Sequence, residues 1–439
     1  MADDAHSTPI DPTATKNLAE QGLRFTLLVS SDDAFEPWFQ AMGRGFHGPI
    51  VDAEQIPTRV EGFAHRRLSG LYDDTLADAK SPVATASSWI ADVTIPGQRT
   101  IPSWAISTIT VAPTHRRRGI ARNLMEAELR TAAALGVPVA ILTASEATIY
   151  ERFGFAPAAM RADWTIDTLA TKWAGPIPDG KVQIVTREQG RDEGGHDILK
   201  RALQQTPGQM YFEGHLWNRL FGLPGRGDPK EMRVVRYDDA DGVQQGLAIY
   251  KVEDAGGFKP EIVHVEYLTS ATDDAYNALW RYLLEIDLVG TVKAGLRSVD
   301  EPVRWQLSNP RAASEDAVGD HLWLRILDVK TTLEARHYNA PGTFVLELDD
   351  ALDYANGYWL LSINDSGTGV VRKLDDSEGF GDNHHLAMNV STLAAIYLGA
   401  TSISTMVKAG RIAQKTMGAA VAADAAFRST TTPWLSTWF

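Results

Sequence analysis

The sequence has no cysteine among its 439 residues. This absence excludes disulfide bonds, thiolate nucleophiles and cysteine-ligated metal sites. Long apolar runs are also missing, because the first twenty residues lack the apolar core of a signal peptide and no uninterrupted apolar stretch is long enough to span a membrane. We therefore expect a cytoplasmic protein without a membrane span.

The chain has fewer positively charged than negatively charged residues. The chain carries 42 lysines and arginines against 56 aspartates and glutamates, a formal net charge of -14. Such a balance disfavours nucleic acid as a partner and raises the local concentration of cationic ligands. Because an acidic surface also serves solubility alone, the charge agrees with a cationic partner without requiring one.

The positive charge that is present includes a run of three arginines, Arg116–Arg118, between a predicted strand and a predicted helix. Residues 103–111 are rich in β-branched and aromatic types, and apolar residues recur at helical spacing from Ile120 onward. Backbone N–H groups at a helix start are unpaired and the dipole end is positive, while Gly119 has no Cβ to obstruct a phosphate oxygen. The pattern predicts a pyrophosphate site to which the arginines add charge-assisted hydrogen bonds.

A second strand and a short helix follow this segment. Residues 137–143 have the pattern of a buried parallel strand, and residues 145–154 form a short helical segment that contains Tyr150 and ends at a glycine. The block from Ile109 to Phe155 resembles the acyl-CoA-binding core of the GNAT acetyltransferases, because Arg116-x-x-Gly119-x-Ala121 matches their signature.

Other segments resemble one GNAT family more closely. The Ala-Ser-Glu-x-x-Ile-Tyr-x-Arg-Phe-Gly run at 144–154, the Leu-Trp-Leu-Arg-Ile run at 322–326 and Leu-Glu-Ala-Arg at 333–336 are similar to the enhanced intracellular survival (Eis) family. The resemblance covers nearly the whole chain.

The length suggests about three domains at roughly 150 residues each, and the run of prolines and glycines at 172–181 marks one boundary. The resemblance implies α/β and α+β structure, with two tandem GNAT-like domains followed by a sterol-carrier-protein-like domain. The predicted division is a flexible leader at 1–22, a catalytic GNAT domain at 23–170, a second GNAT-like domain at 171–321, and an α+β domain at 322–439.

The second GNAT-like domain has a different strand-to-helix turn. At 269–274 hydroxyl residues and two aspartates replace the arginines and the glycine. Carboxylates at a helix start repel a pyrophosphate, so we expect this domain to have no cofactor site.

Two residues are the candidates for catalysis. In the GNAT fold the position of Tyr150 faces the thioester sulfur, which favours a general acid, although taken alone Tyr150 also fits an amphipathic core residue. The chain ends in two tryptophans and Phe439, which is unusual because termini are generally polar and frayed. The Eis resemblance implies that the Phe439 carboxylate is the general base; packing of the tail at a subunit interface is the alternative.

The resemblance also implies the residues that bind the cosubstrate acetyl-CoA. The backbone of strand 109–111 would pair with the pantetheine arm, the arginine loop would hold the pyrophosphate, and the segment after the second strand would contact the far side. These residues are Ile109, Thr110, Val111, Arg116, Arg117, Arg118, Gly119, Ile120, Ala121, Arg122, Ser145 and Glu146.

One departure concerns the amine pocket. Family members that act on aminoglycosides have a glutamate before the terminal phenylalanine, and here Trp438 takes that place. A second acid expected after the first helix is absent from the stretch 45–49. The reaction type is therefore better supported by the sequence than the substrate.

The leading hypothesis is an acetyl-CoA-dependent N-acetyltransferase acting on amines of polycationic small molecules, with aminoglycoside antibiotics modified at more than one amine. A protein-lysine or polyamine N-acetyltransferase is the alternative. A lipid or sterol carrier with a vestigial acyltransferase domain is a third possibility. The resemblance further implies a homo-oligomer, a hexamer. No metal is expected, since the adjacent His384 and His385 would point to opposite faces of a strand.

Overall fold

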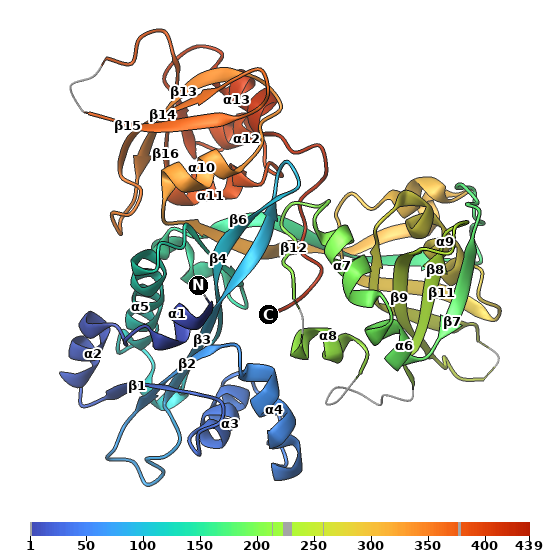
Figure 1. Cartoon of the computed structure of the whole chain (residues 1–439), viewed down its shortest axis with the longest axis horizontal. Coiled ribbons are helices and arrows are strands. Elements are labelled where there is room, and N and C mark those ends of the chain that lie inside the picture. Colours follow the sequence, from blue (N-terminus) through green and yellow to red (C-terminus); the bar gives the residue numbers. More distant parts are fainter. Residues whose placement is uncertain (1, 213, 223–230, 258, 376–378) are drawn as a thin grey trace.

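The computed structural model describes residues 2–212, 214–222, 231–257, 259–375 and 379–439. Two sheets organise the chain (Figure 1). A twelve-stranded sheet has the order β1-β2-β3-β4-β5-β12-β6-β11-β10-β9-β8-β7, and a separate five-stranded sheet has the order β15-β14-β13-β16-β17.

The first GNAT-like domain supplies one half of the large sheet. Its strands are β1 (Arg24–Leu28), β2 (Arg67–Tyr72), β3 (Ala84–Ile95), β4 (Arg99–Val111), β5 (Val139–Thr143) and β6 (Ala156–Asp167). Its helices are α1 (Ala2–Ser7), α2 (Pro12–Ala19), α3 (Phe35–Gly45), α4 (Ile56–Phe63) and α5 (Ile120–Ala134), and short 3-10 turns cover 147–149 and 151–153.

The second domain repeats this arrangement in the other half. Its strands are β7 (Lys181–Val185), β8 (Arg233–Asp238), β9 (Gln244–Glu253), β10 (Glu261–Ser270), β11 (Val289–Arg297) and β12 (Ala313–Ile326). Its helices are α6 (Arg187–Asp192), α7 (Gly195–Leu203), α8 (His215–Leu220) and α9 (Asp273–Leu284).

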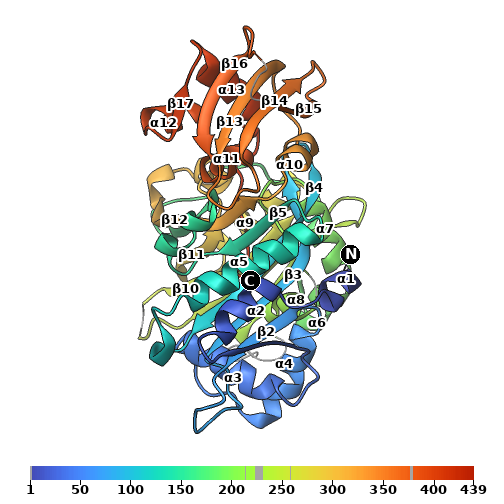
Figure 2. The ribbon, with the colours of Figure 1, turned by 90° about the vertical axis from the view of Figure 1, so that its left-hand side faces the viewer.

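The third domain is α+β, as expected from the sequence. Its strands are β13 (Gly342–Asp349), β14 (Gly357–Ile363), β15 (Gly369–Leu374), β16 (His384–Asn389) and β17 (Ile412–Gln414). Its helices are α10 (Val329–Ala335), α11 (Val390–Tyr397), α12 (Ile403–Lys408) and α13 (Ala419–Phe427). All eight residues of α11 are buried. This helix packs against β6 and β12 of the large sheet, and the five-stranded sheet lies beyond it at one end of the molecule (Figure 2).

Strand β12 joins the two GNAT-like domains. Leu322–Ile326 pair antiparallel with β5 and Ala313–Leu324 pair antiparallel with β6, so β12 lies between two strands of the first domain. The predicted start of the third domain at residue 322 is therefore wrong, because Leu322–Ile326 complete the large sheet and the third domain begins at α10. The strand partners of 322–326 are more than 150 residues away in the sequence, so no local pattern places this run in the large sheet.

The predicted flexible leader is also corrected, because α1 and α2 pack on the first domain. Asp11 caps α2 by accepting the Ala14 N–H at 2.7 Å and forms a 2.9 Å ion pair with Arg130 of α5. Leu18 is fully buried. A proline at the first helical position and apolar residues one turn apart were the available signals, but the polar composition of the segment obscured them.

A buried ion pair fixes the third domain to the large sheet. Arg325 of β12 donates to both carboxylate oxygens of Asp350 at 2.8 and 2.7 Å, and neither side chain is exposed to solvent by more than 1%. Asp350 also accepts the backbone N–H groups of three residues in the turn after β13, Leu352, Tyr354 and Ala355.

Replacing Arg325 tests this junction. The change Arg325→Met leaves the Asp350 carboxylate buried without its counter-charge, and we expect a loss of about 3–5 kcal/mol in unfolding free energy, measured by urea denaturation. The control Lys330→Ala removes an exposed, 3.9 Å ion pair with Glu334 and should change stability by less than about 0.5 kcal/mol. Equal effects of the two substitutions would contradict this role for the buried pair.

Candidate active site

The site begins where two parallel strands separate. β4 and β5 pair only at Ser103–Ala105 with Val139–Ile141, although β4 continues to Val111 and β5 to Thr143. Thr108 has φ +55° at a bulge where the register with β3 shifts. The gap contains a cavity of about 240 Å³, lined by Phe46, Ile106, Ser107, Thr108, Ile109, Leu142, Thr143, Ser145, Tyr150, Trp438 and Phe439.

The start of α5 has the geometry of an anion site. Gly119 is the N-cap with φ +74°, and no side chain caps the helix. A Cβ on Gly119 would meet only the Asn123 amide nitrogen, at 3.9 Å. Arg117 also has a positive φ of +63°, and alternating backbone conformations of this kind turn successive N–H groups to one side. The uncapped N–H groups and the open space at Gly119 fit a pyrophosphate.

The predicted arginine cluster divides into two groups. Arg118 donates to the carbonyl of Gln21 at 3.0 Å, and Arg122 donates to Glu126 at 2.7 Å, so both guanidinium groups already have protein partners. Arg116 and Arg117 are exposed, and within the described ranges their side chains make no hydrogen bond or ion pair. Arg116 and Arg117 are therefore the arginines available to an anion.

Only some of the remaining predicted cofactor residues line the cavity. Ile109 and Ser145 line it, whereas Glu146 is exposed outside it and accepts a hydrogen bond from Thr148 at 3.2 Å. The Thr110 hydroxyl pairs with that of Thr85 at 2.7 Å, which leaves only its backbone for a ligand. Three predicted cofactor residues remain. Val111 is the last residue of β4, and Ile120 and Ala121 begin the first turn of α5.

Tyr150 lines the cavity. Its ring contacts Phe155 and, from β12, Trp323 at centroid distances of 6.3 and 6.2 Å. Burial raises the pKa of Tyr150, against an opposing effect of the Ser145 hydroxyl. The phenol is therefore protonated at neutral pH, which is the state that a general acid requires.

The C-terminal tail enters the same cavity. Figure 1 shows it running from the third domain between the other two domains to the middle of the molecule. The Phe439 ring packs edge-on against Trp89 at 5.5 Å, and the Thr143 hydroxyl donates to the main-chain oxygen of Phe439 at 3.1 Å. The two predicted catalytic residues, Tyr150 and Phe439, thus line one cavity although 289 positions separate them.

A buried histidine helps to hold the tail. His321 of β12 donates from Nε2 to the Thr437 carbonyl at 2.9 Å, and its ring lies 4.4 Å from that of Trp438. Arg219 donates to the Trp438 carbonyl at 3.1 Å. Burial lowers the pKa of His321 to about 4, with Arg161 adding to the effect and the hydrogen bond to Thr437 opposing it, so the imidazole beside the docked tail is neutral at neutral pH.

Acidification should therefore loosen the tail. His321 is protonated near the ordinary histidine pKa of 6.5 in the unfolded chain and only near 4 in the folded chain, so this group's contribution to stability is present above pH 6.5 and is lost as the pH falls towards 4. The change His321→Gln keeps a donor for Thr437 but does not titrate. Between pH 7 and 4.5 the unfolding free energy of the native chain should fall by about 2 kcal/mol more than that of the variant; parallel curves would contradict the assignment.

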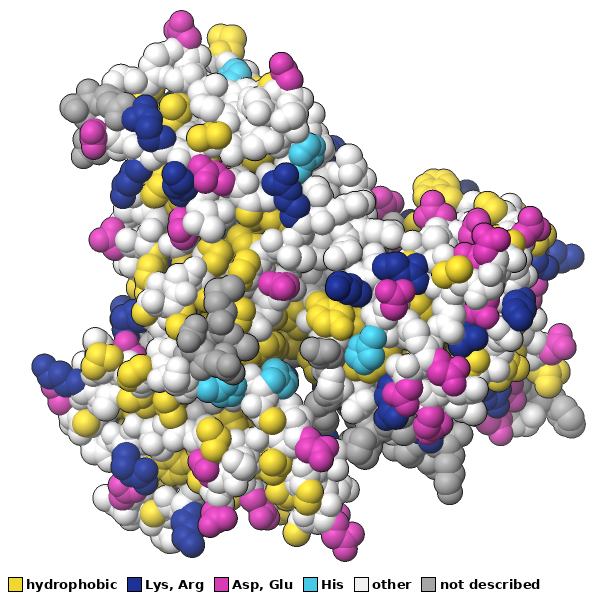
Figure 3. Space-filling model, viewed as in Figure 1, with side chains coloured by type: hydrophobic (Ala, Val, Ile, Leu, Met, Phe, Trp, Pro, Cys, Tyr) yellow, Lys and Arg dark blue, Asp and Glu magenta, His cyan; other side chains and the backbone are white. Residues whose placement is uncertain are grey.

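The surface beside the tail combines apolar side chains with two cationic residues and one carboxylate among the described residues. Trp438 is 40% exposed and borders both the first cavity and a second of about 360 Å³, which Arg219, Lys251 and Glu266 also line. The Lys251 ammonium and the Glu266 carboxylate are paired at 3.0 Å. Figure 3 shows hydrophobic side chains gathered in the hollow at the centre of this face.

Several residues of the site escaped sequence analysis. Thr143 was recognised only as the end of a strand, and neither Trp89 nor Phe46 was singled out. Thr143 and Trp89 contact Phe439, and Phe46 lines the same cavity. These placements depend on where the tail docks, and no local sequence pattern specifies a contact across so many residues. The adjacent histidines are confirmed as separate: His384 stacks on Phe344, while His385 hydrogen-bonds Glu347 at 3.0 Å.

Comparisons with known proteins agree with this geometry. Models of an acetyltransferase (GNAT) domain match residues 29–158 and 213–326, and a sterol carrier protein domain matches 329–436. An uncharacterized N-acetyltransferase of Streptomyces avermitilis is 33% identical over 92% of this chain and 96% of its own. N-acetyltransferase Eis of Mycobacterium tuberculosis is 32% identical over 77% of this chain and 81% of its own. The chain belongs to the Eis family of N-acetyltransferases.

Solved structures support the same assignment. Eis1 from Mycobacterium abscessus superposes with a TM-score of 0.79 at 28% identity, over 95% of this chain and all of that one. A GCN5-related N-acetyltransferase from Anabaena variabilis has the same fold at 20% identity, with a TM-score of 0.77 over 95% of this chain and all of that one. As an Eis-family protein, the chain is a GNAT N-acetyltransferase; GNAT acetyltransferases use acetyl-CoA. Of the helices in the described ranges, none has the length and apolarity needed to cross a membrane.

Proposed function

We propose that this Eis-family protein transfers the acetyl group of acetyl-CoA directly to amines of a polycationic small molecule, with aminoglycosides as the leading class. In this proposal Tyr150 is the general acid and the carboxylate of Phe439, taken as the last residue of the protein, is the general base. The observation that carries it is the convergence of Tyr150 and Phe439 on one cavity in the gap between β4 and β5.

The chain offers a continuous path for acetyl-CoA. The first turn of α5 with Gly119, together with Arg116 and Arg117, would hold the pyrophosphate. The free edge of β4 at 106–111 would hydrogen-bond the pantetheine arm, and Ser145 would lie beside it. The thioester would then lie next to Tyr150.

The acid and the base have separate tasks in the transfer. The acceptor nitrogen attacks the thioester carbonyl carbon, the nitrogen gives up its proton to the Phe439 carboxylate, and the C–S bond breaks as Tyr150 protonates the sulfur. In water a tyrosine near pKa 10 gives a proton to a thiolate near 8.5 at a cost of about 2 kcal/mol. Burial raises the pKa of Tyr150, but a thiolate in the same cavity is desolvated as well, which offsets that increase.

The acceptor class rests on weaker support than the reaction. The net charge of -14 attracts polyamines, whereas Trp438 and Arg219 beside the tail add no negative charge. A protein lysine or a simple polyamine is therefore the competing acceptor. The uncapped helix start at Gly119 counts against a vestigial domain in a lipid carrier. The hexameric assembly and the cytoplasmic location stay predictions.

Removing the Tyr150 hydroxyl should impair chemistry more than binding. Tyr150→Phe keeps the ring contacts with Phe155 and Trp323, so the affinity for acetyl-CoA should change by less than about threefold, whereas kcat should fall by about 10²–10³. Steady-state kinetics and calorimetry with acetyl-CoA measure the two effects. An unchanged kcat would remove Tyr150 from the mechanism.

Extending the chain tests the base. One glycine added after Phe439 moves the carboxylate out of reach of Thr143 and should lower kcat by about 10²-fold while leaving acetyl-CoA affinity nearly unchanged. Phe439→Leu, which keeps the carboxylate in place, is the matched control and should retain most of the activity. A fully active extended chain would leave the base unidentified.

Mass spectrometry of the acetylated products identifies the class of acceptor. Incubation with acetyl-CoA and kanamycin-like aminoglycosides should add more than one acetyl group, 42 Da each by chemical composition, to a molecule. Spermidine and a lysine peptide serve as competing acceptors. Faster acetylation of either competitor would overturn the aminoglycoside assignment and leave the N-acetyltransferase assignment intact.

A further inference from the structure

The second domain contains a gap of the same kind as the active-site gap. β10 and β11 are parallel and pair from Glu261–Val265 with Val289–Ala294, after which β10 continues to Ser270 and β11 to Arg297. Helix α9 follows β10 through a short turn, as α5 follows β4. The gap between β10 and β11 is therefore the second domain's equivalent of the gap between β4 and β5, where the thioester is proposed to bind in the first domain.

Coenzyme A does not suit this second gap. The Thr272 hydroxyl caps α9 by accepting the Ala275 N–H at 3.2 Å, and Asp273 and Asp274 lie in the first turn. The N–H groups that α5 leaves open are thus partly occupied here, and two carboxylates repel phosphate. This geometry supports the expectation that the second domain has no cofactor site.

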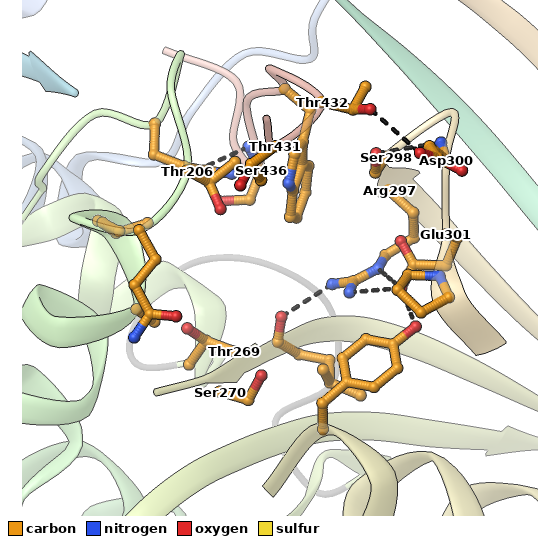
Figure 4. Close-up of a pocket in the computed structure, with 18 of the residues that line it drawn as sticks. Thr206, Thr269, Ser270, Arg297, Ser298, Asp300, Glu301, Thr431, Thr432 and Ser436 are labelled. Carbon is orange, nitrogen blue, oxygen red and sulfur yellow. Dashed lines mark hydrogen bonds and ion pairs between the residues drawn. The ribbon is translucent and has the colours of Figure 1, made fainter. Parts of the chain in front are cut away.

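The gap nevertheless remains open, with a cavity of about 380 Å³, which is within the size range of small-molecule sites. Figure 4 shows Thr269 and Ser270 on one side of the open space and Thr206, Thr431 and Ser436 on the other. Hydroxyl groups dominate the lining, and they come from Thr206, Thr269, Ser270, Ser298, Thr430, Thr431, Thr432 and Ser436.

The charged side chains that line the cavity are of two kinds: one buried ion pair and two exposed aspartates. Buried Arg297 forms a 2.8 Å ion pair with Glu301 and donates to the Leu268 carbonyl at 2.8 Å, so this pair is neutral. Asp273 and Asp300 are exposed and both line the cavity, Asp273 from the first turn of α9 and Asp300 from the segment after β11. Their two negative charges have no counter-charge among the residues that line the cavity. An anion is repelled here, while a cation with hydroxyl groups finds both carboxylates and hydrogen-bond partners.

The tail forms one wall of this cavity. The Trp434 ring lies over the Arg297 guanidinium at 4.9 Å, and Ser436 bonds through its hydroxyl to Gln209, another lining residue, at 2.8 Å. Only two residues, Thr437 and Trp438, separate Ser436 from Phe439 in the active-site cavity. One segment of chain therefore contacts both gaps.

We propose that the cavity between β10 and β11 is a second, non-catalytic site that binds a small hydroxylated cation of the aminocyclitol type and orders the tail that carries Phe439. Asp273 and Asp300 attract the ammonium groups, and the hydroxyls on β10 and on the tail bind those of the ligand. The proposal concerns binding only, so its test does not depend on whether the protein transfers acetyl groups.

The test is calorimetry of 2-deoxystreptamine with the full chain in the absence of acetyl-CoA, so that no turnover occurs. The double change Asp273→Asn with Asp300→Asn should weaken binding at this site about tenfold. Asp287→Asn, an exposed aspartate of the same domain outside the cavity, is the matched control and should leave the affinity unchanged. Ser270→Phe, which fills the gap, should abolish this binding without removing a charge.

A second readout follows the tail. Amide hydrogen exchange in residues 430–436 should slow when 2-deoxystreptamine is added to the native chain, and should not slow in the double variant. Equal affinity of the native chain and both cavity variants, or no binding at millimolar concentrations, would overturn the proposal. Acetyl-CoA binding, titrated in parallel, should be the same in all variants; its absence would contradict the proposed function and leave this inference standing.

Discussion

The separation of β4 from β5 beyond Ala105 is the constraint on which the rest of the structure depends. β4 pairs with β3 on its outer edge and β5 pairs with β12 on its outer edge, so outside partners hold the two strands apart. The inner edge of β4 is left with unpaired backbone groups, which are costly to bury unless a ligand or another segment bonds them. The gap is therefore the candidate site, and Tyr150 and Phe439 both line its cavity.

The origin of β12 explains how the two GNAT-like domains are coupled. The last strand of the second domain lies between β5 and β6 of the first. The same strand carries His321, which holds the tail, and Arg325, which anchors the third domain. The gap between β4 and β5, the tail and the third domain thus all contact one strand, so the large sheet of the first domain is completed by a later part of the chain.

The local chemistry of the site is predictable from the sequence, but its assembly is not. The arginine loop, Gly119 and the Tyr150 turn lie within about 40 consecutive residues, and each follows from strand, helix-start and turn patterns that act at short range. The order of β12 in the sheet, the packing of α1 and α2, and the docking of Phe439 depend on contacts between distant segments. The sequence also does not show which arginines of the loop are free to bind an anion, since only the structure reveals that Arg118 and Arg122 have protein partners.

The most direct test of the account is a crystal structure of the full chain with coenzyme A. We predict the pyrophosphate at the first turn of α5, beside Gly119, Arg116 and Arg117, and the sulfur between β4 and β5 within hydrogen-bond reach of the Tyr150 hydroxyl. Coenzyme A bound between β10 and β11, or density anywhere other than the α5 end of the first gap, would contradict the central claim.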